Sequence, residues 1–176
     1  MLLRATKLPG VYVLEPERHE DERGFFARVW CRDEFTARGL NGDLSQISVS
    51  YNRRRGTLRG MHWQAAPHAE AKVVRCTRGA IFDVALDLRR DVPTTRQWVG
   101  IELTAANGHA LYIPEGCAHG FQTLSDDTEV LYLISAPYHA TAARGARWDD
   151  PAFAIAWPAG ERIINERDRN WPLWPV

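Results

Sequence analysis

The chain has 176 residues, of which 45% are hydrophobic and 25% are charged, as is usual for a globular protein with a sizeable core. Its 22 basic and 22 acidic residues cancel, which gives no general attraction to nucleic acid or to an anionic membrane. No apolar run has the length of a membrane span or a signal peptide. The three cysteines, Cys31, Cys76 and Cys117, are too scattered for a disulfide framework. We therefore expect one cytoplasmic domain over residues 1–176.

Short runs of alternating apolar and polar residues, separated by turns, dominate the chain and predict an all-β fold. The segment after residue 136 is rich in Trp and Pro, and we expect it to wrap the outside as irregular or helical chain. This pattern is typical of a double-sheet jelly roll or barrel. In chain order, we predict strands at 11–15 and 25–30, a short helix at 31–39 that ends at Gly39, and strands at 45–51, 57–64, 72–78, 80–88, 97–103, 110–114, 120–124 and 129–135.

Lys72 is unusual in this composition. Of the 22 basic residues, only Lys7 and Lys72 are lysines, and the rest are arginines. Lysine is a compact point charge on a flexible stem, unlike the planar guanidinium of arginine. Because Lys72 begins a predicted strand, it is a candidate for stabilising a negatively charged oxygen inside the barrel. A solvated lysine at the end of a strand is the alternative.

The segment GHALYIPEGCAHG (108–120) resembles the second sequence motif of the cupin superfamily of small jelly rolls, and it would direct His119 into the barrel. The first cupin motif binds metal through two histidines one residue apart and a glutamate. Here His62 is followed by Gln64 on the same strand face, and Glu70 is displaced. One imidazole, one amide and a displaced acid do not make a three-ligand metal site. We therefore expect no metal, and the absence of a dinucleotide or P-loop motif gives no other cofactor.

The chain resembles the dTDP-4-dehydrorhamnose 3,5-epimerases in segments that follow the same order over nearly its whole length. The resemblance implies a metal-free, cupin-type, usually dimeric enzyme that epimerises C3 and C5 of a nucleotide-linked 4-keto-6-deoxyhexose. The segments are DERGFF (21–26), RGMHWQ (59–64), AKVVR (71–75), IFDVALDLR (81–89), PTTRQW (93–98), IPEGCAHGF (113–121), EVLYLISAPY (129–138), WDDP (148–151) and IAWP (155–158).

The residues suit this chemistry. A C4 ketone acidifies the hydrogens on both neighbouring carbons, so inversion needs a base, a group that stabilises the enolate and an acid on the opposite face. Tyr132 shares a strand face with Val130 and Ile134, which is compatible with a position inside the barrel. The resemblance implies five catalytic residues: His62 as the base, Asp168 as the carboxylate that orients it, Lys72 and His119 at the enolate oxygen, and Tyr132 as the acid.

The resemblance also implies a substrate site. Arg59 would meet the diphosphate, although strict strand alternation puts it opposite His62, so that both reach one ligand only if Gly60 bends or bulges the strand. The segment from Arg23 to Phe26 would come from the partner subunit of a homodimer. The remaining nucleotide-binding candidates are Gln46, Ser48, Tyr138 and Arg28.

Three single positions and one short segment depart from the family pattern. Arg28 replaces an acidic residue, residues 46–50 (QISVS) replace Gln-Asp-Asn-x-Ser, Glu70 replaces a glutamine and Asn165 replaces a serine. A reversed charge at a binding residue alters ligand preference. These departures leave open which nucleotide is bound and whether one or both centres are inverted.

Several alternatives remain open from the sequence. An enzyme of the same kind could be a single-centre 3- or 5-epimerase, or a 3,4-ketoisomerase. Other classes are a metal-dependent cupin oxygenase and a sugar-binding jelly roll without catalysis. Residues 53–55 (RRR) are more typical of a solvated hairpin turn than of a phosphate site, and Cys117 is more typical of a small buried residue than of a thiol nucleophile.

Overall fold

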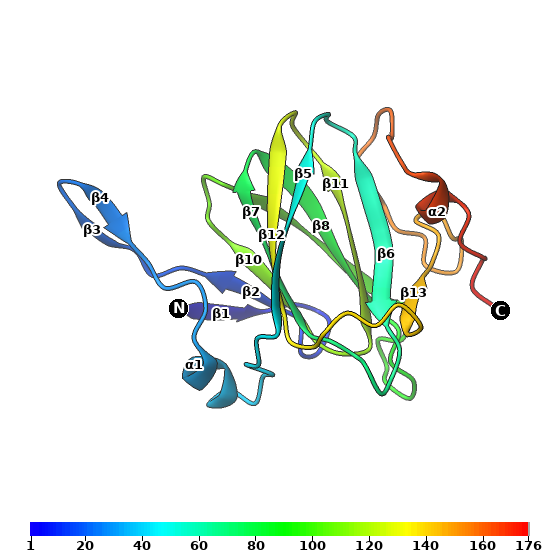
Figure 1. The fold of residues 1–176 in the computed structure, drawn as a ribbon, viewed down its shortest axis with the longest axis horizontal. Helices are drawn as coiled ribbons and strands as arrows, with labels where there is room; N and C mark the ends of the chain where they lie inside the picture. The colour runs from blue at the N-terminus through cyan, green and yellow to red at the C-terminus, as the bar shows by residue number, and fades with distance from the viewer. Residues whose placement is uncertain (176) are drawn as a thin grey trace.

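Two facing β-sheets form the body of the protein in a computed structural model that describes residues 1–175 (Figure 1). The elements in chain order are β1 (Leu2–Ala5), β2 (Tyr12–Glu15), β3 (His19–Asp21), β4 (Gly24–Phe26), α1 (Arg32–Thr36), β5 (Gln46–Asn52), β6 (Leu58–Gln64), β7 (Lys72–Arg78), β8 (Ala80–Asp87), β9 (Trp98–Thr104), β10 (Ala110–Ile113), β11 (Cys117–Thr123), β12 (Thr128–Ile134), β13 (Ala143–Gly145) and α2 (Glu166–Arg169).

The order of the strands gives the jelly-roll topology. One sheet has six strands in the order β1-β2-β10-β7-β12-β5, and the other has five in the order β13-β6-β11-β8-β9. Strands far apart in sequence are neighbours in both sheets, since β10 lies between β2 and β7, and β11 between β6 and β8. All of these pairs are antiparallel. The predicted all-β, double-sheet jelly roll is confirmed.

Three hydrophobic clusters follow from the alternation of side chains along the strands. The first fills the space between the sheets and includes Val74, Ala85, Leu111 and Phe121. The second covers the outer face of the five-stranded sheet, where the C-terminal segment packs as the sequence predicted. The third lies on the six-stranded sheet around Phe35 of α1, whose ring meets the edge of Tyr112. The second cluster contains Leu58, Met61, Val84, Leu86, Ala118, Ala146, Phe153 and Trp157.

Some predicted boundaries were wrong. The strand predicted at 25–30 ends at Phe26, and the strand predicted at 120–124 begins earlier, at Cys117. The short strands β1, β3 and β13 were not predicted, because they have only three or four residues each and no long alternation. The predicted helix at 31–39 exists as the shorter α1, and Gly39 follows it with a φ of 70°, as expected for a left-handed stop.

The β3–β4 hairpin projects away from the two sheets, as Figure 1 shows at its blue end. The ring of Phe25 stacks on the guanidinium of Arg18, 4.5 Å from its centre, yet half of the residue stays exposed. Phe26 is 73% exposed. Two large apolar side chains on a projecting hairpin favour a surface that another molecule covers.

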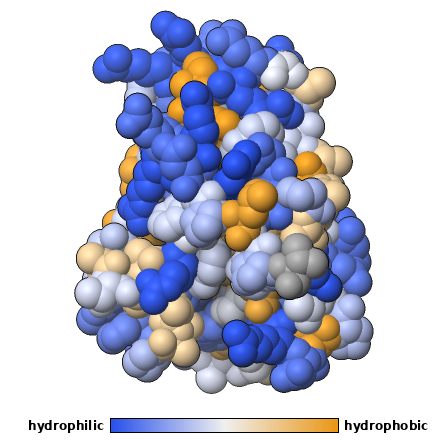
Figure 2. All heavy atoms as spheres, turned by 90° about the vertical axis from the view of Figure 1, so that its right-hand side faces the viewer, coloured by the Kyte–Doolittle hydropathy of each residue, from blue (hydrophilic) through white to orange (hydrophobic). Residues whose placement is uncertain are grey.

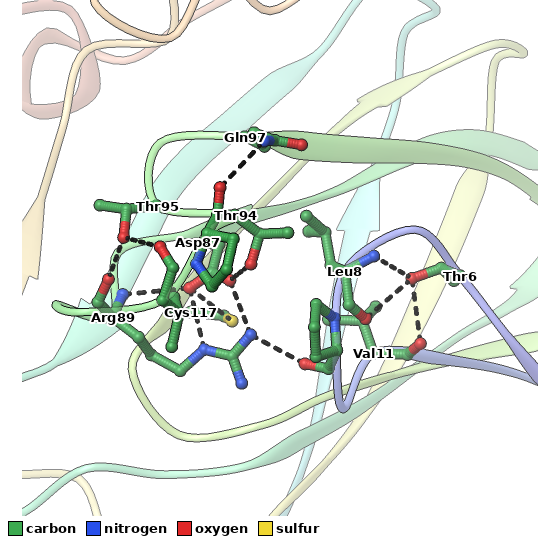
Figure 3. A network of polar contacts seen from close by, with 12 residues as sticks. Thr6, Leu8, Val11, Asp87, Arg89, Thr94, Thr95, Gln97 and Cys117 are labelled. Carbon is green, nitrogen blue, oxygen red and sulfur yellow. Dashed lines mark hydrogen bonds and ion pairs between the residues drawn. The ribbon is translucent and has the colours of Figure 1, made fainter.

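A polar network around Asp87 lies at the end of β8 (Figure 3). The carboxylate of Asp87, which is fully buried, accepts hydrogen bonds from Arg89 Nε at 2.9 Å, Arg89 Nη2 at 2.6 Å and Thr94 Oγ1 at 2.6 Å. Arg89 also donates to the carbonyl of Pro9 at 2.8 Å, which ties the loop before β2 to the other sheet. Burial alone would raise the pKa of Asp87, but the hydrogen bonds from Arg89 and Thr94 outweigh it and lower that pKa.

The C-terminal segment ends beside β6. Residues 163 and 57 form a parallel bridge, and Leu58 N–H donates to the carbonyl of Ile163 at 2.9 Å, which sets α2 next to β6. The face seen in Figure 2 is mostly hydrophilic, with hydrophobic residues in small separate groups. Within residues 1–175, no helix is long and apolar enough to cross a membrane.

Candidate active site

Two adjoining cavities open between the sheets and share His62, Lys72 and Ile134. One has a volume of about 200 Å³ and is called here the Gln46 cavity; the other, of about 310 Å³, is called the Tyr132 cavity. The other residues of the Gln46 cavity include Gln64, Glu70, Tyr138, Arg144 and Arg167. Those of the Tyr132 cavity are Ser48, Ser50, Arg59, His119, Phe121, Tyr132, Asn165 and Asp168.

His62 and Asp168 form the central pair. His62 Nε2 lies 2.6 Å from Asp168 Oδ1, and Asp168 Oδ2 accepts from the N–H of Gly60 at 3.2 Å. The side chain of Asp168 is 1% exposed and that of His62 is 42% exposed, so the imidazole is open to the cavities with the carboxylate behind it. Burial alone would raise the pKa of Asp168, but the hydrogen bond and charge of His62 outweigh it and lower that pKa.

The strand irregularity at Gly60 puts Arg59 and His62 on the same side of β6. His119 pairs with His62 but Phe121 pairs with Arg59, so the register between β11 and β6 shifts by one residue across Gly60. Leu58 and Met61 consequently both face the outer cluster, while Arg59 and His62 both line the Tyr132 cavity. A Cβ at Gly60, where φ is 125°, would lie 2.5 Å from the Cα of Gly120. The bend or bulge at Gly60 that Arg59 and His62 require to reach one ligand is therefore present, and only glycine fits there.

Lys72 lies inside the barrel, not in solvent. Its side chain is 12% exposed, and its Nζ lies 2.5 Å from Glu70 Oε1 and 3.5 Å from the carbonyl oxygen of His62. Glu70 is itself 7% exposed. The ammonium of Lys72 therefore borders both cavities beside His62, held by the buried carboxylate of Glu70, for which the sequence predicted no contact with Lys72.

His119 has a carboxylate partner of its own. Its Nε2 lies 2.6 Å from Oδ1 of Asp83, which is fully buried, and its ring meets Tyr132 edge-on with centroids 5.8 Å apart. Burial, followed by the charge of Asp83, raises the pKa of Tyr132, so the phenol keeps its proton at neutral pH. Tyr132 faces the barrel interior as predicted.

Gln64 joins two loops. Its Nε2 donates to the carbonyls of His68 at 2.9 Å and Pro137 at 3.1 Å, and its Oε1 accepts from the N–H of His139 at 2.6 Å. The rings of His68 and His139 stack with centroids 3.6 Å apart. The amide is thus fully used in protein contacts. Among residues 1–175, no group of three or more His, Cys, Asp or Glu side chains is arranged to hold a metal ion.

The predicted nucleotide-binding residues fall into two groups. Gln46 and Tyr138 border the Gln46 cavity, where Gln46 Oε1 accepts from the N–H of Tyr138 at 2.7 Å, and Ser48 borders the Tyr132 cavity. The second group lies away from both cavities of its own chain: Arg23 pairs with Asp21 in the projecting hairpin, Phe26 is exposed there, and Arg28 pairs with Glu34 of α1 at 3.0 Å.

Two residues of the site were missed as participants, although the sequence held a signal for each. Asp83 shares one face of β8 with Ala85 and Asp87. An acid on an inward strand face needs a hydrogen-bonding or charged partner. Asn165 was noted only as a departure from serine. Its Oδ1 accepts from the N–H of Asp168 at 2.7 Å as the N-cap of α2, a role that serine and asparagine fill equally well.

Two lesser interpretations agree with the structure. Cys117 is 2% exposed, and burial raises the pKa of its thiol to about 12, so it stays protonated rather than acting as a nucleophile. The arginines at 53–55 lie in an exposed turn that is fixed by backbone contacts, such as Arg55 N–H to Asp126 Oδ1 at 2.7 Å, and they border neither cavity.

Comparisons with known proteins find one family over nearly the whole length of the chain. A sequence profile described as dTDP-4-dehydrorhamnose 3,5-epimerase matches residues 5–175. The dTDP-4-dehydrorhamnose 3,5-epimerase of Sinorhizobium fredii is 41% identical over 173 residues, which cover 98% of this chain and 89% of that one. The dTDP-4-dehydrorhamnose 3-epimerase of Streptomyces niveus is 38% identical over 171 residues, which cover 97% and 82%.

Solved structures give the same result. The crystal structure of dTDP-4-dehydrorhamnose 3,5-epimerase from Elizabethkingia anophelis NUHP1 superposes with a TM-score of 0.96 at 37% identity and covers 99% of this chain and 96% of that one. Sequence and fold therefore agree with the geometry built around His62 and Asp168. The chain belongs to the dTDP-4-dehydrorhamnose 3,5-epimerase family.

Proposed function

We propose that the protein epimerises a nucleotide-linked 4-keto-6-deoxyhexose, with dTDP-4-dehydro-6-deoxyglucose as the substrate that its family favours, and inverts both C3 and C5. The observation that carries the proposal is the arrangement around one cavity of an imidazole backed by a buried carboxylate, an ammonium and a protonated phenol. The whole chain acts as one catalytic domain in the cytoplasm. The three cysteines of residues 1–175 are unpaired, which supports the cytoplasmic location.

His62 is the base in this mechanism. Because the lowered pKa keeps Asp168 ionised, its carboxylate accepts a hydrogen bond, so His62 Nε2 carries the hydrogen. Nδ1 is then the nitrogen with a lone pair for the proton from C3 or C5. Once His62 is protonated, the imidazolium is stabilised by the same carboxylate.

Lys72 and His119 act on the oxygen at C4. When the proton leaves C3 or C5, negative charge develops on that oxygen, and the ammonium of Lys72 beside it stabilises the enolate. Because Asp83 holds Nε2 of His119, His119 donates to the oxygen through Nδ1 when its ring is an imidazolium. Such a donor typically contributes about 3 kcal/mol or more to lowering the barrier. Tyr132, which borders the cavity with its phenol protonated, returns a proton to the carbon from the other side.

A further set of residues, named below, would bind the nucleotide and the diphosphate of the substrate. Arg59 offers a planar fork for the diphosphate, and Gln46, Ser48 and Tyr138 border the cavities where the nucleotide would extend. The exposed hairpin with Arg23 and Phe26 reaches away from its own cavities, which supports a homodimer in which each hairpin completes the partner's nucleotide site. Arg28, which pairs with Glu34, would belong with Arg23 and Phe26 to the surface that faces the partner.

Isotope exchange tests the proposal. The protein is incubated with dTDP-4-dehydro-6-deoxyglucose in D₂O, and the hydrogens at C3 and C5 are followed by NMR. Exchange and inversion at both carbons are expected. His62→Ala should abolish exchange at both, because no other group replaces the base. Absence of exchange in the parent, or equal exchange in His62→Ala and the parent, would contradict the proposal.

A single-centre epimerase is the second candidate. The matching Streptomyces niveus protein bears the name of a 3-epimerase, and Arg28 and residues 46–50 depart from the family pattern at the nucleotide end. The same NMR measurement separates the two candidates. Exchange at C3 alone, with C5 retaining its hydrogen through many turnovers, would favour the single-centre enzyme.

A further inference from the structure

The carboxylate of Glu70 has one oxygen that the proposed mechanism does not use. Oε1 lies 2.5 Å from Lys72 Nζ, whereas Oε2 is buried and has no hydrogen-bond partner among residues 1–175. The residue is 7% exposed. A buried carboxylate oxygen without a donor costs free energy, and a ligand that brings a hydrogen-bond donor recovers it.

Glu70 borders the Gln46 cavity together with His62 and Lys72. Because Lys72 holds Oε1, the orientation of the carboxylate is set, and the residue shares the cavity wall with the two groups that would act next to the C4 ketone. A hexose seated against His62 and Lys72 brings its ring hydroxyls to the same carboxylate. Those hydroxyls are at C2 and C3, since C1 carries the diphosphate and C5 bears the ring oxygen.

An ionised carboxylate only accepts hydrogen bonds, whereas a glutamine amide both donates and accepts. Glu70 therefore selects for a donor at this place: a hydroxyl satisfies Oε2, and a fluorine or a missing oxygen leaves Oε2 without a hydrogen-bond donor. We propose that Glu70 is a specificity-determining residue whose Oε2 accepts a hydrogen bond from the C2 or C3 hydroxyl of the hexose. This inference rests on the proposed function, because His62 and Lys72 place the sugar.

Supporting Lys72 is the other role that Glu70 could have. If that were its whole contribution, replacing the carboxylate would change the rate with every substrate by the same factor. Recognition of a hydroxyl instead makes the effect of Glu70 depend on whether the substrate carries that hydroxyl. The two roles are separated by crossing the variant with altered substrates.

The experiment compares the parent with Glu70→Gln, which keeps the size of the side chain. The substrates are dTDP-4-dehydro-6-deoxyglucose and its analogues with fluorine in place of the C2 or the C3 hydroxyl. The measured quantity is kcat/KM for deuterium exchange at C5, a carbon bonded to neither C2 nor C3. Glu161→Gln is the matched control, because it removes the same charge from an exposed side chain that borders neither cavity.

The parent and Glu161→Gln should lose about tenfold or more in kcat/KM with one of the two analogues, as for a hydrogen bond to a charged acceptor. Glu70→Gln should lose much less with that analogue. Equal losses in the parent and in Glu70→Gln with both analogues would overturn the inference and leave Glu70 a support for Lys72.

A parent that accepts both analogues as well as the natural sugar would also overturn the inference, even if Glu70→Gln failed to fold. Deuterium exchange of the natural sugar by the parent tests the proposed function separately from the role of Glu70. A parent without any exchange would remove both proposals together, whereas discrimination lost at Glu70 alone leaves the epimerase intact.

Discussion

His62 and Gln64 show how a single residue can decide whether a strand binds a metal ion or supplies a base. Both face the cavity from β6, but the amide of Gln64 is occupied by the loops at His68 and His139, while His62 meets the carboxylate of Asp168. An imidazole with a buried anionic partner on one nitrogen is suited to accept a proton on the other. The same strand position in a metal-binding relative would instead direct two imidazoles at one ion.

Asp168→Asn tests the tautomer that this pair imposes. The amide oxygen can still accept from the N–H of Gly60, which turns the amide NH₂ toward His62 Nε2 and places the imidazole hydrogen on Nδ1, the nitrogen that should act as base. Exchange at C3 and C5 should fall by about 10²-fold or more. An exchange rate equal to that of the parent, in a variant with the parent's thermal unfolding curve, would exclude this role.

Tyr132→Phe separates the removal of the proton from its return. The phenol is protonated at neutral pH because burial and Asp83 raise its pKa, and the variant lacks that proton donor. We expect deuterium exchange to continue while net inversion falls by about 10²-fold or more. NMR of the substrate in D₂O measures both. Equal loss of exchange and inversion would show instead that Tyr132 is needed to form the enolate.

At the scale of elements, the site depends on two short segments that local sequence patterns barely signal. The helix α2 has four residues and would not persist alone, but it carries Asp168 to a histidine 106 positions earlier in the chain. The hairpin β3–β4 has three residues in each strand and carries Phe26 into solvent. The helix α2 acts through its contact with β6, and the role proposed for the hairpin requires a partner subunit.

Mixed dimers test whether the hairpin acts on the partner subunit. His62→Ala and Phe26→Ala chains with different tags are co-expressed, and the hybrid is purified. If the hairpin completes the partner's site, one of the two sites in the hybrid combines an intact His62 with an intact Phe26, and activity returns. If each hairpin served its own chain, the hybrid would be no more active than the Phe26→Ala protein.

The sequence predicted the strands with long alternation and, through the family resemblance, most of the site. His62, Lys72 and Tyr132 lie on such strands, so alternation fixes the faces they occupy. The carboxylate partners were harder. Asp83 could have been inferred from its inward position, and the contact between Glu70 and Lys72 from their spacing of two residues at the start of β7. Tertiary packing, which local patterns do not encode, decided the pairing of His62 with Asp168 across 106 positions.

At the scale of the whole molecule, the Asp87 network joins the two sheets, and neither Asp87 nor Arg89 borders the two cavities (Figure 3). Asp87→Asn keeps the shape but leaves Arg89 without its counter-charge. We expect a loss of about 3 kcal/mol in the free energy of unfolding, measured with urea near pH 7. Unchanged stability would show that the network is replaced by solvent without cost.

The pH dependence of this loss has a defined sign. The pKa of Asp87 is lower in the folded protein than in the unfolded chain, so its contribution is present above the ordinary aspartate range and disappears as the pH falls through the folded value. The difference in unfolding free energy between parent and Asp87→Asn should therefore shrink below about pH 4. A difference that stayed constant down to acid unfolding would assign the effect to shape and not to charge.

Because α2 is attached beside β6, the activity of the enzyme depends on the position of its C-terminal segment. Asp168 reaches His62 only while residues 161–165 stay aligned with the start of β6, through the bridge between Thr57 and Ile163. A bulky label or fusion that pulled this segment away would silence catalysis and leave both sheets assembled. Turnover would thus report whether this segment, which contributes Asn165, Arg167 and Asp168 to the walls of the two cavities, is in place.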